Sequence, residues 1–190
     1  MAEFIQKHKL FSFYSTLMIV VVLIAIFAPW LAPGDAFSSN LSQALQAPSS
    51  QHWFGTDKLG RDVLSRIIYG TQLSLFMGVS IVVIMVSIGT IIGAVAGYFG
   101  GKIETVVMRL ADIMLSFPGV VLAIAIAGIL GGSIVNTIIA LSVVGWAKYA
   151  RLVRSMTLKV RGEDYVTAPV MMGASTTTIL RRHIIPNILP

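Results

Sequence analysis

The chain has 190 residues, of which 56% are hydrophobic and only 12% are charged, and its mean hydropathy is +0.85. A soluble domain carries roughly 25% charged residues, and a globule this small has no means of hiding so much apolar surface from water. Lipid must therefore be the solvent for much of the chain. The absence of cysteine excludes disulfides. The net charge of +6 suggests nucleic acid as a partner until its distribution is considered.

The first apolar run covers residues 14–31 and follows Lys7 and Lys9, an arrangement also found in signal peptides. Its 18 residues exceed the apolar core of a typical signal peptide, and Ala28-Pro29-Trp30 is a poor cleavage site. Trp30 suits a membrane interface. We predict a tail over residues 1–13 and an uncleaved first transmembrane helix over residues 14–31.

Three further runs are long enough to cross a membrane, which takes about 20 helical residues. Residues 73–98 contain no charge in 26 positions. Residues 106–130 carry Arg109 and Asp112 near one end, and Pro118 should kink this helix. Residues 133–156 begin after a Gly-Gly turn and must continue through Lys148, whose long stem can snorkel to the interface. We predict an all-α transmembrane bundle with four spans.

The basic residues set the predicted orientation. With the N-terminus in the cytoplasm and four alternating spans, eleven basic residues are cytoplasmic and three are external. The cytoplasmic set is Lys7, Lys9, Lys102, Arg109, Lys148, Arg151, Arg154, Lys159, Arg161, Arg181 and Arg182, and the external set is Lys58, Arg61 and Arg66. This positive-inside distribution accounts for the net charge, so membrane lipid is the expected partner and nucleic acid is not.

The external segment covers residues 32–72. Its first part is rich in turn-forming residues and is expected to be irregular. In its second part, Asp62–Tyr69, the residues Val63 and Ile67 share one helical face. We predict a short amphipathic helix that lies on the membrane there.

Gly89, Gly93 and Gly97 recur every fourth residue of the second span, and Gly101 continues the series. Such a stripe lets a second helix approach the backbone closely. We predict that it packs against another helix, in this chain or in a partner, with a role in gating as the alternative.

Arg109 and Asp112 lie one turn apart near the cytoplasmic end of the third span. An isolated carboxylate at the bilayer centre is costly, so we predict an interfacial ion pair between these two residues that sets the depth of the helix. A proton relay is the alternative.

No catalytic or metal-binding pattern is found. The residues His8, His52 and His183 lie far apart in sequence, and Gly100-Gly101-Lys102 lacks the first glycine and the Ser or Thr of a phosphate-binding loop. We therefore expect no enzyme activity, no metal site and no bound cofactor in this chain.

The closing segment, residues 161–190, predicts a cytoplasmic helix–turn–helix. Asp164 suits a helix N-terminus, Gly173 is a natural break, and Ser175 or Thr176 can cap a second helix. That helix should end with basic residues before Pro186. Exposed Met171 and Met172 near the turn suit docking into a groove of a partner, and an amphipathic hairpin lying on lipid is the alternative.

Two blocks of sequence resemble one known family. Ala168-Pro169, Gly173-Ala174-Ser175 and Ile185-Pro186-Asn187 are similar to the EAA loop of permeases from ATP-binding-cassette (ABC) importers, in the variant of the dipeptide, oligopeptide and nickel branch. The same branch is resembled by His52-Trp53-Phe54-Gly55-Thr56-Asp57, Gly60-Arg61-Asp62, Ala96-Gly97-Tyr98-Phe99-Gly100-Gly101, Met108-Arg109-Leu110-Ala111-Asp112 and Phe117-Pro118. The matches run in the family's order from about residue 50 to the end.

The resemblance implies a permease subunit that imports a peptide or nickel across the cytoplasmic membrane, with about six spans in a complete member. Its partners would be ABC ATPase subunits that bind ATP and Mg, a second homologous permease and an extracytoplasmic substrate-binding protein facing the external segment. The residues expected to couple to the ATPase are Thr167, Ala168, Pro169, Met171, Met172, Gly173, Ala174, Arg182, His183, Ile185 and Pro186.

The sequence departs from the family pattern in two places. Thr167 and Pro169 stand where Glu and Ala are usual, so any salt bridge made by that Glu is missing. Family members also carry about two more spans after this loop, whereas this chain stops at Pro190, so we expect a C-terminally truncated sequence. A channel or structural membrane module without an ATPase is the alternative function.

Overall fold

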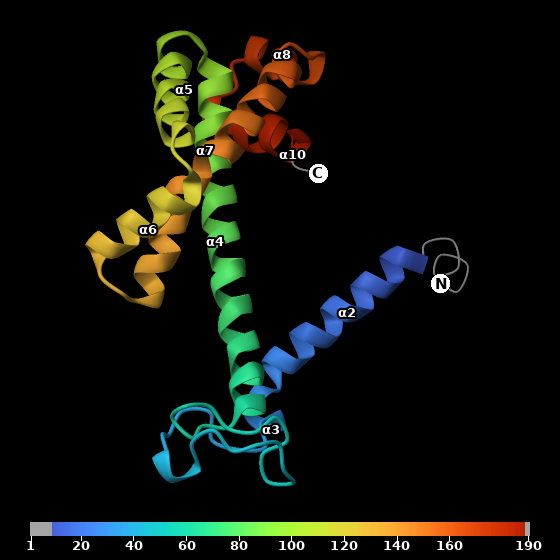
Figure 1. Cartoon of the computed structure of the whole chain (residues 1–190). Coiled ribbons are helices and arrows are strands. Elements are labelled where there is room, and N and C mark those ends of the chain that lie inside the picture. Colours follow the sequence, from blue (N-terminus) through green and yellow to red (C-terminus); the bar gives the residue numbers. More distant parts are fainter. Residues whose placement is uncertain (1–8, 189–190) are drawn as a thin grey trace. The chain divides into compact units, whose positions relative to one another are not determined.

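A computed structural model describes residues 9–188 (Figure 1). The described residues form helices and loops without a β-strand, and the one isolated β-bridge joins Thr56 and Asp62. The prediction of an all-α protein is thus confirmed. The chain divides into two compact units, Met1–Gly78 and Val79–Pro190.

The first unit begins with helix α2 (Lys9–Ile26), which is followed by the short helix α3 (Ala28–Leu31). The expected first span, 14–31, therefore falls on two helices that are separated at Phe27, which precedes Pro29 by two residues. Helix α2 alone is long and apolar enough to cross a membrane. Most of the expected tail, including Lys7 and His8, lies outside the described residues.

The segment after α3 is irregular apart from the 3₁₀ turn η1 (Leu41–Gln43). The first and second halves of this segment are joined by backbone hydrogen bonds. Asn40 N–H donates to Leu59 O over 2.9 Å, and Thr56 N–H donates to Gln46 O over 3.1 Å. The two halves thus form one folded lobe despite the high content of turn-forming residues.

The separate amphipathic helix predicted for Asp62–Tyr69 is not found. These residues instead form the first turns of helix α4 (Val63–Phe99), which continues for 37 residues without interruption. Gly70 is the one glycine between the amphipathic part and the apolar run, and no proline lies there, so the backbone hydrogen bonds propagate through both. At 1.5 Å per residue α4 is about 55 Å long, well beyond the ~30 Å hydrocarbon core of a bilayer.

The prediction that residues 106–130 form a single kinked helix is wrong. The structure has α5 (Gly101–Ser116) and α6 (Gly119–Leu130), with a bend of 92° between them. Phe117 is extended, with φ −94° and ψ 148°, because the ring of a following proline disfavours the helical conformation. Pro118 therefore breaks this segment rather than bending it.

Helix α7 (Ile134–Val160) contains the expected fourth span, 133–156, and Ser133 caps its N-terminus by accepting a hydrogen bond from Asn136 N–H. Among the described residues, two helices, α2 and α4, qualify as membrane spans by length and composition, and α5 with α6 makes a third if the bent pair crosses as one. Helix α7, which carries four basic residues in its second half, is not among them. Its crossing of the membrane stays a prediction.

The glycine stripe of α4 lies directly against α7. A Cβ atom added to Gly93 would stand 2.4 Å from Ala150 O, and one added to Gly97 would stand 2.8 Å from the Cβ of Thr157. At Gly89 the nearest atom is the Cβ of Tyr149, at 2.5 Å. Only glycine permits this approach of the two backbones. Gly101 does not extend the stripe, because nothing lies within 4 Å of its Cβ position.

The closing segment contains α8 (Asp164–Met171), α9 (Thr176–Ile179), the π-helical turn η2 (Leu180–Ile184) and α10 (Ile185–Ile188). The last three follow one another without a break. The expectation that Pro186 ends the second helix is therefore wrong. The wider turn at η2 changes the hydrogen-bonding register just ahead of the proline, which has no N–H to donate.

Candidate functional site

The helical hairpin formed by α8, α9, η2 and α10 is fixed to the rest of its unit by an apolar core. Four of its side chains and two from longer helices are buried together, namely Val166, Ile179, Ile184 and Ile188 of the hairpin with Ala94 of α4 and Val153 of α7. Fully burying one such aliphatic side chain contributes about 1.5–3 kcal/mol. The hairpin is thus a rigid extension of α4 and α7.

Gly173 makes the turn between the two arms of the hairpin. Its φ is +81°, a left-handed conformation that costs other residues about 1–2 kcal/mol. Gly173 N–H donates to Val170 O and Ala174 N–H donates to Pro169 O, each over 3.0 Å. This pair of bonds is the Schellman motif, which satisfies the last carbonyls of a helix.

Ser175 then starts the second arm. Its hydroxyl oxygen accepts a hydrogen bond from Thr178 N–H over 3.3 Å, so the cap predicted at Ser175 or Thr176 is at Ser175. The first arm of the hairpin therefore ends, and the second arm begins, at local sequence signals that lie within three residues of one another.

The tip of the hairpin exposes a small apolar patch, which we call the tip patch and define as Val170, Met171 and Met172. The two methionines are 87% and 81% exposed. Unbranched thioether side chains adapt to an irregular surface. The apolar face of the hairpin is used inside the chain, and the tip patch is the apolar surface left at its end.

The eleven residues expected to couple to an ATPase are divided between exposed and partly buried positions. Ala168, Met171, Met172, Gly173, Arg182 and Pro186 are exposed, and Thr167, Pro169, Ala174, His183 and Ile185 are partly buried. Of these, Ala174 and Ile185 pack against the core of the hairpin. These two residues hold the hairpin in place, while the exposed ones are available to a partner.

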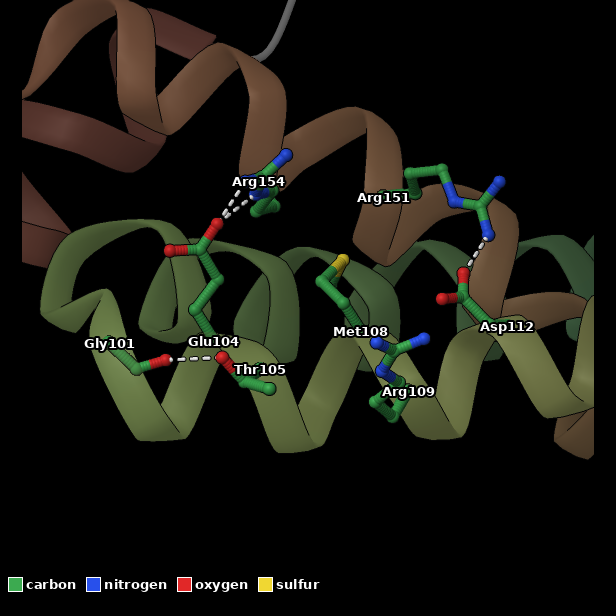
Figure 2. A pocket seen from close by; sticks show the side chains of 8 residues that line it. All are labelled: Gly101, Glu104, Thr105, Met108, Arg109, Asp112, Arg151 and Arg154. Carbon is green, nitrogen blue, oxygen red and sulfur yellow. Dashed lines mark hydrogen bonds and ion pairs between the residues drawn. The ribbon is translucent and has the colours of Figure 1, made fainter.

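A charged pocket of about 560 Å³ lies between α5 and α7 (Figure 2). Arg151 Nη2 donates to Asp112 Oδ1 over 2.6 Å, and Arg154 Nε donates to Glu104 Oε1 over 2.6 Å. Two ion pairs therefore join the two antiparallel helices.

The predicted ion pair between Arg109 and Asp112 is wrong. The guanidinium of Arg151 reaches Asp112 from the neighbouring helix, and Arg109 has no ion pair with any residue that the structure describes. Arg109 still lines the same pocket. Arg109 thus has no counter-charge among the described residues, whereas the other charged side chains that line the pocket form ion pairs.

Arg161 joins the base of the hairpin to the end of α4. Its Nη1 donates to Tyr98 O over 3.0 Å and, at a longer 3.3 Å, to Gly97 O. The last carbonyls of a helix lack partners within the helix and carry partial negative charge, so a guanidinium stabilises them. Sequence analysis counted Arg161 only among the basic residues that set the orientation, because a cap contributed from 64 residues away leaves no local signal.

The ion pair between Glu104 and Arg154 was also missed in the sequence analysis, although the sequence contains a signal for it. Arg151 and Arg154 share one face of α7, and Glu104 and Asp112 lie two turns apart on α5. Opposite charges on antiparallel helices attract across the contact. The pairing becomes visible once α5 and α7 are known to be neighbours.

The folded lobe of the first unit, residues 32–62, contains a buried polar network together with the start of α4. Asp62, which is 2% exposed, lies 3.0 Å from His52 Nδ1 and accepts a hydrogen bond from Ser65 N–H over 2.7 Å. Ser65 Oγ in turn accepts from Gly34 N–H over 3.0 Å. Burial acts to raise the pKa of Asp62, but the hydrogen bonds from Ser65 and His52 outweigh it, so its pKa is lowered.

A second carboxylate of the lobe is also held ionised. The guanidinium of Arg61, at 2.7 Å from Asp57 Oδ2, lowers the pKa of Asp57 to about 2. Within residues 9–188, no three His, Asp or Glu side chains gather closely enough to hold a metal ion.

Comparison with known proteins gives two family matches. Residues 89–190 match the family described as "Binding-protein-dependent transport system inner membrane component", and residues 5–48 match "N-terminal TM domain of oligopeptide transport permease C". The two matches together include most of the chain.

Similar curated proteins are found over nearly the whole chain. It is 42% identical over 185 residues to the dipeptide transport system permease protein DppC of Alkalihalophilus pseudofirmus, which covers 97% of this chain and 61% of that protein. It is 40% identical over 176 residues to the probable D,D-dipeptide transport system permease protein DdpC of Escherichia coli, with coverage of 93% and 59%. It is 44% identical over 174 residues to the glutathione transport system permease protein GsiD of another Escherichia coli strain, with coverage of 90% and 56%. The chain thus spans about 60% of the length of these relatives.

Proposed function

Because this chain belongs to the family of binding-protein-dependent transport system inner membrane components, we propose that it acts as the permease subunit of an ABC importer. The substrate that we propose is a peptide. The relatives named above carry dipeptide, D,D-dipeptide or glutathione in their names, and these names favour peptides over nickel.

The observation that carries the proposal is the hairpin formed by α8–α10. Its apolar core ties it to α4 and α7, its turn is fixed at Gly173, and its tip patch is exposed. A rigid lever with an adaptable apolar end is what a membrane subunit needs to receive motion from a separate ATPase. We assign ATP and Mg binding, and hydrolysis, to such partner subunits.

The remaining partners follow from the same proposal. A second, homologous permease would complete the pathway, and an extracytoplasmic substrate-binding protein would dock on the external lobe of residues 32–62. Closure of the ATPases would move the hairpins and switch the pathway between outward and inward access.

We place the N-terminus and the hairpin in the cytoplasm on the distribution of basic residues, with α7 as a further span. The chain contains no cysteine, so single cysteines report the side directly. Ser49→Cys should react with a membrane-impermeant thiol reagent added outside intact cells, and Gly162→Cys should react only after the membrane is opened. The opposite pattern would reverse the orientation.

The coupling role is tested with Met171→Asp combined with Met172→Asp in the assembled transporter. Two carboxylates at the tip patch should abolish retention of the ATPase and transport, because an apolar cleft disfavours a charge by several kcal/mol. Gly162→Asp adds the same charge at the base of the hairpin, where nothing lies within 4 Å of the Cβ position, and should leave both activities intact. Full ATPase binding and transport by the double variant would sink the coupling assignment.

A further inference from the structure

The contact between α5 and α7 holds two pockets, one after the other along the same helices. The charged pocket described above uses α5 as far as Asp112 and α7 from Arg151 onward. A second pocket of about 510 Å³ uses α5 from Met114 onward and α7 as far as Tyr149. We call the two together the α5–α7 seam. One end of the seam is therefore ionic and the other end is lined mainly by apolar side chains.

The apolar pocket is built from flexible and aliphatic side chains. Its lining includes Met85 of α4, Met114 and Leu115 of α5, and Leu141 and Val144 of α7. Met85 leans onto α7 where Gly145 has no side chain, since a Cβ there would stand 1.7 Å from the Met85 sulfur. Methionine side chains readily rearrange around an apolar guest. A lining of this kind suits a hydrocarbon chain.

Each pocket of the seam is lined by one cation that has no counter-charge in the described part of the chain. Lys148 lines the apolar pocket and Arg109 the charged one. Both are exposed, and neither forms an ion pair with a residue in the described part of the chain. The carboxylates nearby are already occupied, Asp112 by Arg151 and Glu104 by Arg154. The seam thus has two positive charges to offer an anion.

The depth of the junction between the two pockets follows from helix geometry. If the hydrocarbon begins at Leu73, where the uncharged run of α4 starts, then about 20 residues cross ~30 Å and the far boundary lies near Gly93. Gly93 is in contact with Ala150 of α7. Lys148 is then just inside this boundary and Arg151 just outside it, so the junction of the pockets is level with lipid headgroups.

We propose that the α5–α7 seam binds one anionic phospholipid, with its phosphate between Arg109 and Lys148 and an acyl chain in the apolar pocket. A basic site between transmembrane helices at headgroup level favours anionic lipid, and the apolar pocket adds the requirement for a chain. The proposal rests on the membrane placement of α4 and α7 and needs neither an ATPase nor a peptide substrate.

The test uses the whole chain, purified in an uncharged detergent and titrated with dioleoyl phosphatidylglycerol or dioleoyl phosphatidylcholine, with bound lipid counted by native mass spectrometry. We expect tighter binding of phosphatidylglycerol. Arg109→Gln and Lys148→Gln should each lower this preference about fivefold, and the double variant about 25-fold. Lys102→Gln, an exposed cation of α5 outside both pockets, should leave the preference unchanged.

Competition by free glycerol phosphate distinguishes the binding of a lipid from the binding of a small anion. It should compete poorly with the lipid, because it has no chain to bury. Equal binding of the two phospholipids, a double variant that keeps its preference, or glycerol phosphate that competes as well as the lipid would each overturn the proposal. Retention of the helical circular-dichroism signal verifies that the variants fold. A failure of peptide transport would leave this measurement untouched, so the two proposals fail independently.

Discussion

The contact of α4 with α7 predicts a measurable penalty for the smallest possible substitution, Gly93→Ala. The added Cβ would stand 2.4 Å from Ala150 O and 3.0 Å from the Cα and carbonyl carbon of the same residue. Real Cβ atoms essentially never approach closer than 3.0 Å, so the two helices must separate by about 0.6 Å. All three opposing atoms belong to the backbone, and no rotation of a side chain can relieve the clash.

The magnitude is obtained by comparison with Gly78→Ala on the same helix, where nothing lies within 4 Å of the new atom. Both substitutions gain the same helix propensity, up to about 1 kcal/mol, so this contribution cancels. What remains is the overpacking at Gly93, which costs about 1–3 kcal/mol. The Gly93→Ala variant should therefore be less stable than the Gly78→Ala variant by that amount.

The assay is titration of each purified variant from a mild detergent into sodium dodecyl sulfate, followed by circular dichroism. The midpoint and slope give the free energy of unfolding. Two variants whose unfolding free energies agree within about 0.5 kcal/mol, the usual spread of inert surface substitutions, would show that α4 and α7 do not approach closely at Gly93.

Three further predictions concern the hairpin and the lobe of residues 32–62. Gly173→Ala should cost about 1–2 kcal/mol, because φ is +81° there, whereas Gly162→Ala should be neutral or stabilising in the same unfolding titration. Ile184→Ala removes a side chain that is fully buried and should cost about 2–5 kcal/mol, with an unchanged unfolding midpoint counting against the hairpin core. In the lobe, the pKa of Asp62 is lowered from 3.8, so its ionised form stabilises the fold above that pH and this contribution is lost as the pH falls through the lowered value. The thermal stability should thus fall more steeply as the pH drops below about 4 in the wild type than in Asp62→Asn, and equal slopes would contradict the network with His52.

Local signals in the sequence were sufficient for the turn of the hairpin. The turn at Gly173 requires a left-handed residue, and Ser175 two positions later supplies a cap, so both arms are determined by side chains within a few positions. The family and the all-α class could also be predicted from the sequence, because the lengths of the apolar runs and the order of the motifs can be read without any knowledge of tertiary contacts.

The break between α5 and α6 was not accessible in the same way. A proline inside an apolar run is compatible with a kinked span, since neighbouring helices can satisfy the freed carbonyl. Whether Pro118 bends or ends a helix depends on the extended conformation of Phe117 and on what packs nearby, and neither is encoded within the run itself.

Ion pairs show the same division between local and distant information. Arg109 and Asp112 have helical spacing and invite a pair within α5, yet Asp112 binds Arg151, which is 39 residues away in sequence. An i, i+3 pair on an exposed helix is stabilised by only ~0.2–0.5 kcal/mol. A second guanidinium with better geometry displaces it at little cost, and spacing alone does not reveal that competitor.

The burial of the hairpin's apolar face favours one of the two interpretations that the sequence left open. An amphipathic hairpin that lies on lipid must keep a continuous apolar face turned outward. Here Val166, Ile179 and Ile184 are each at most 1% exposed, so the face that would enter lipid is already occupied by the protein's own core. The apolar surface that remains at the tip is Val170, Met171 and Met172, a patch at the end of a rigid lever. Such a patch is too small to anchor the hairpin on a bilayer, and it is suited to a partner that grips the hairpin at its tip.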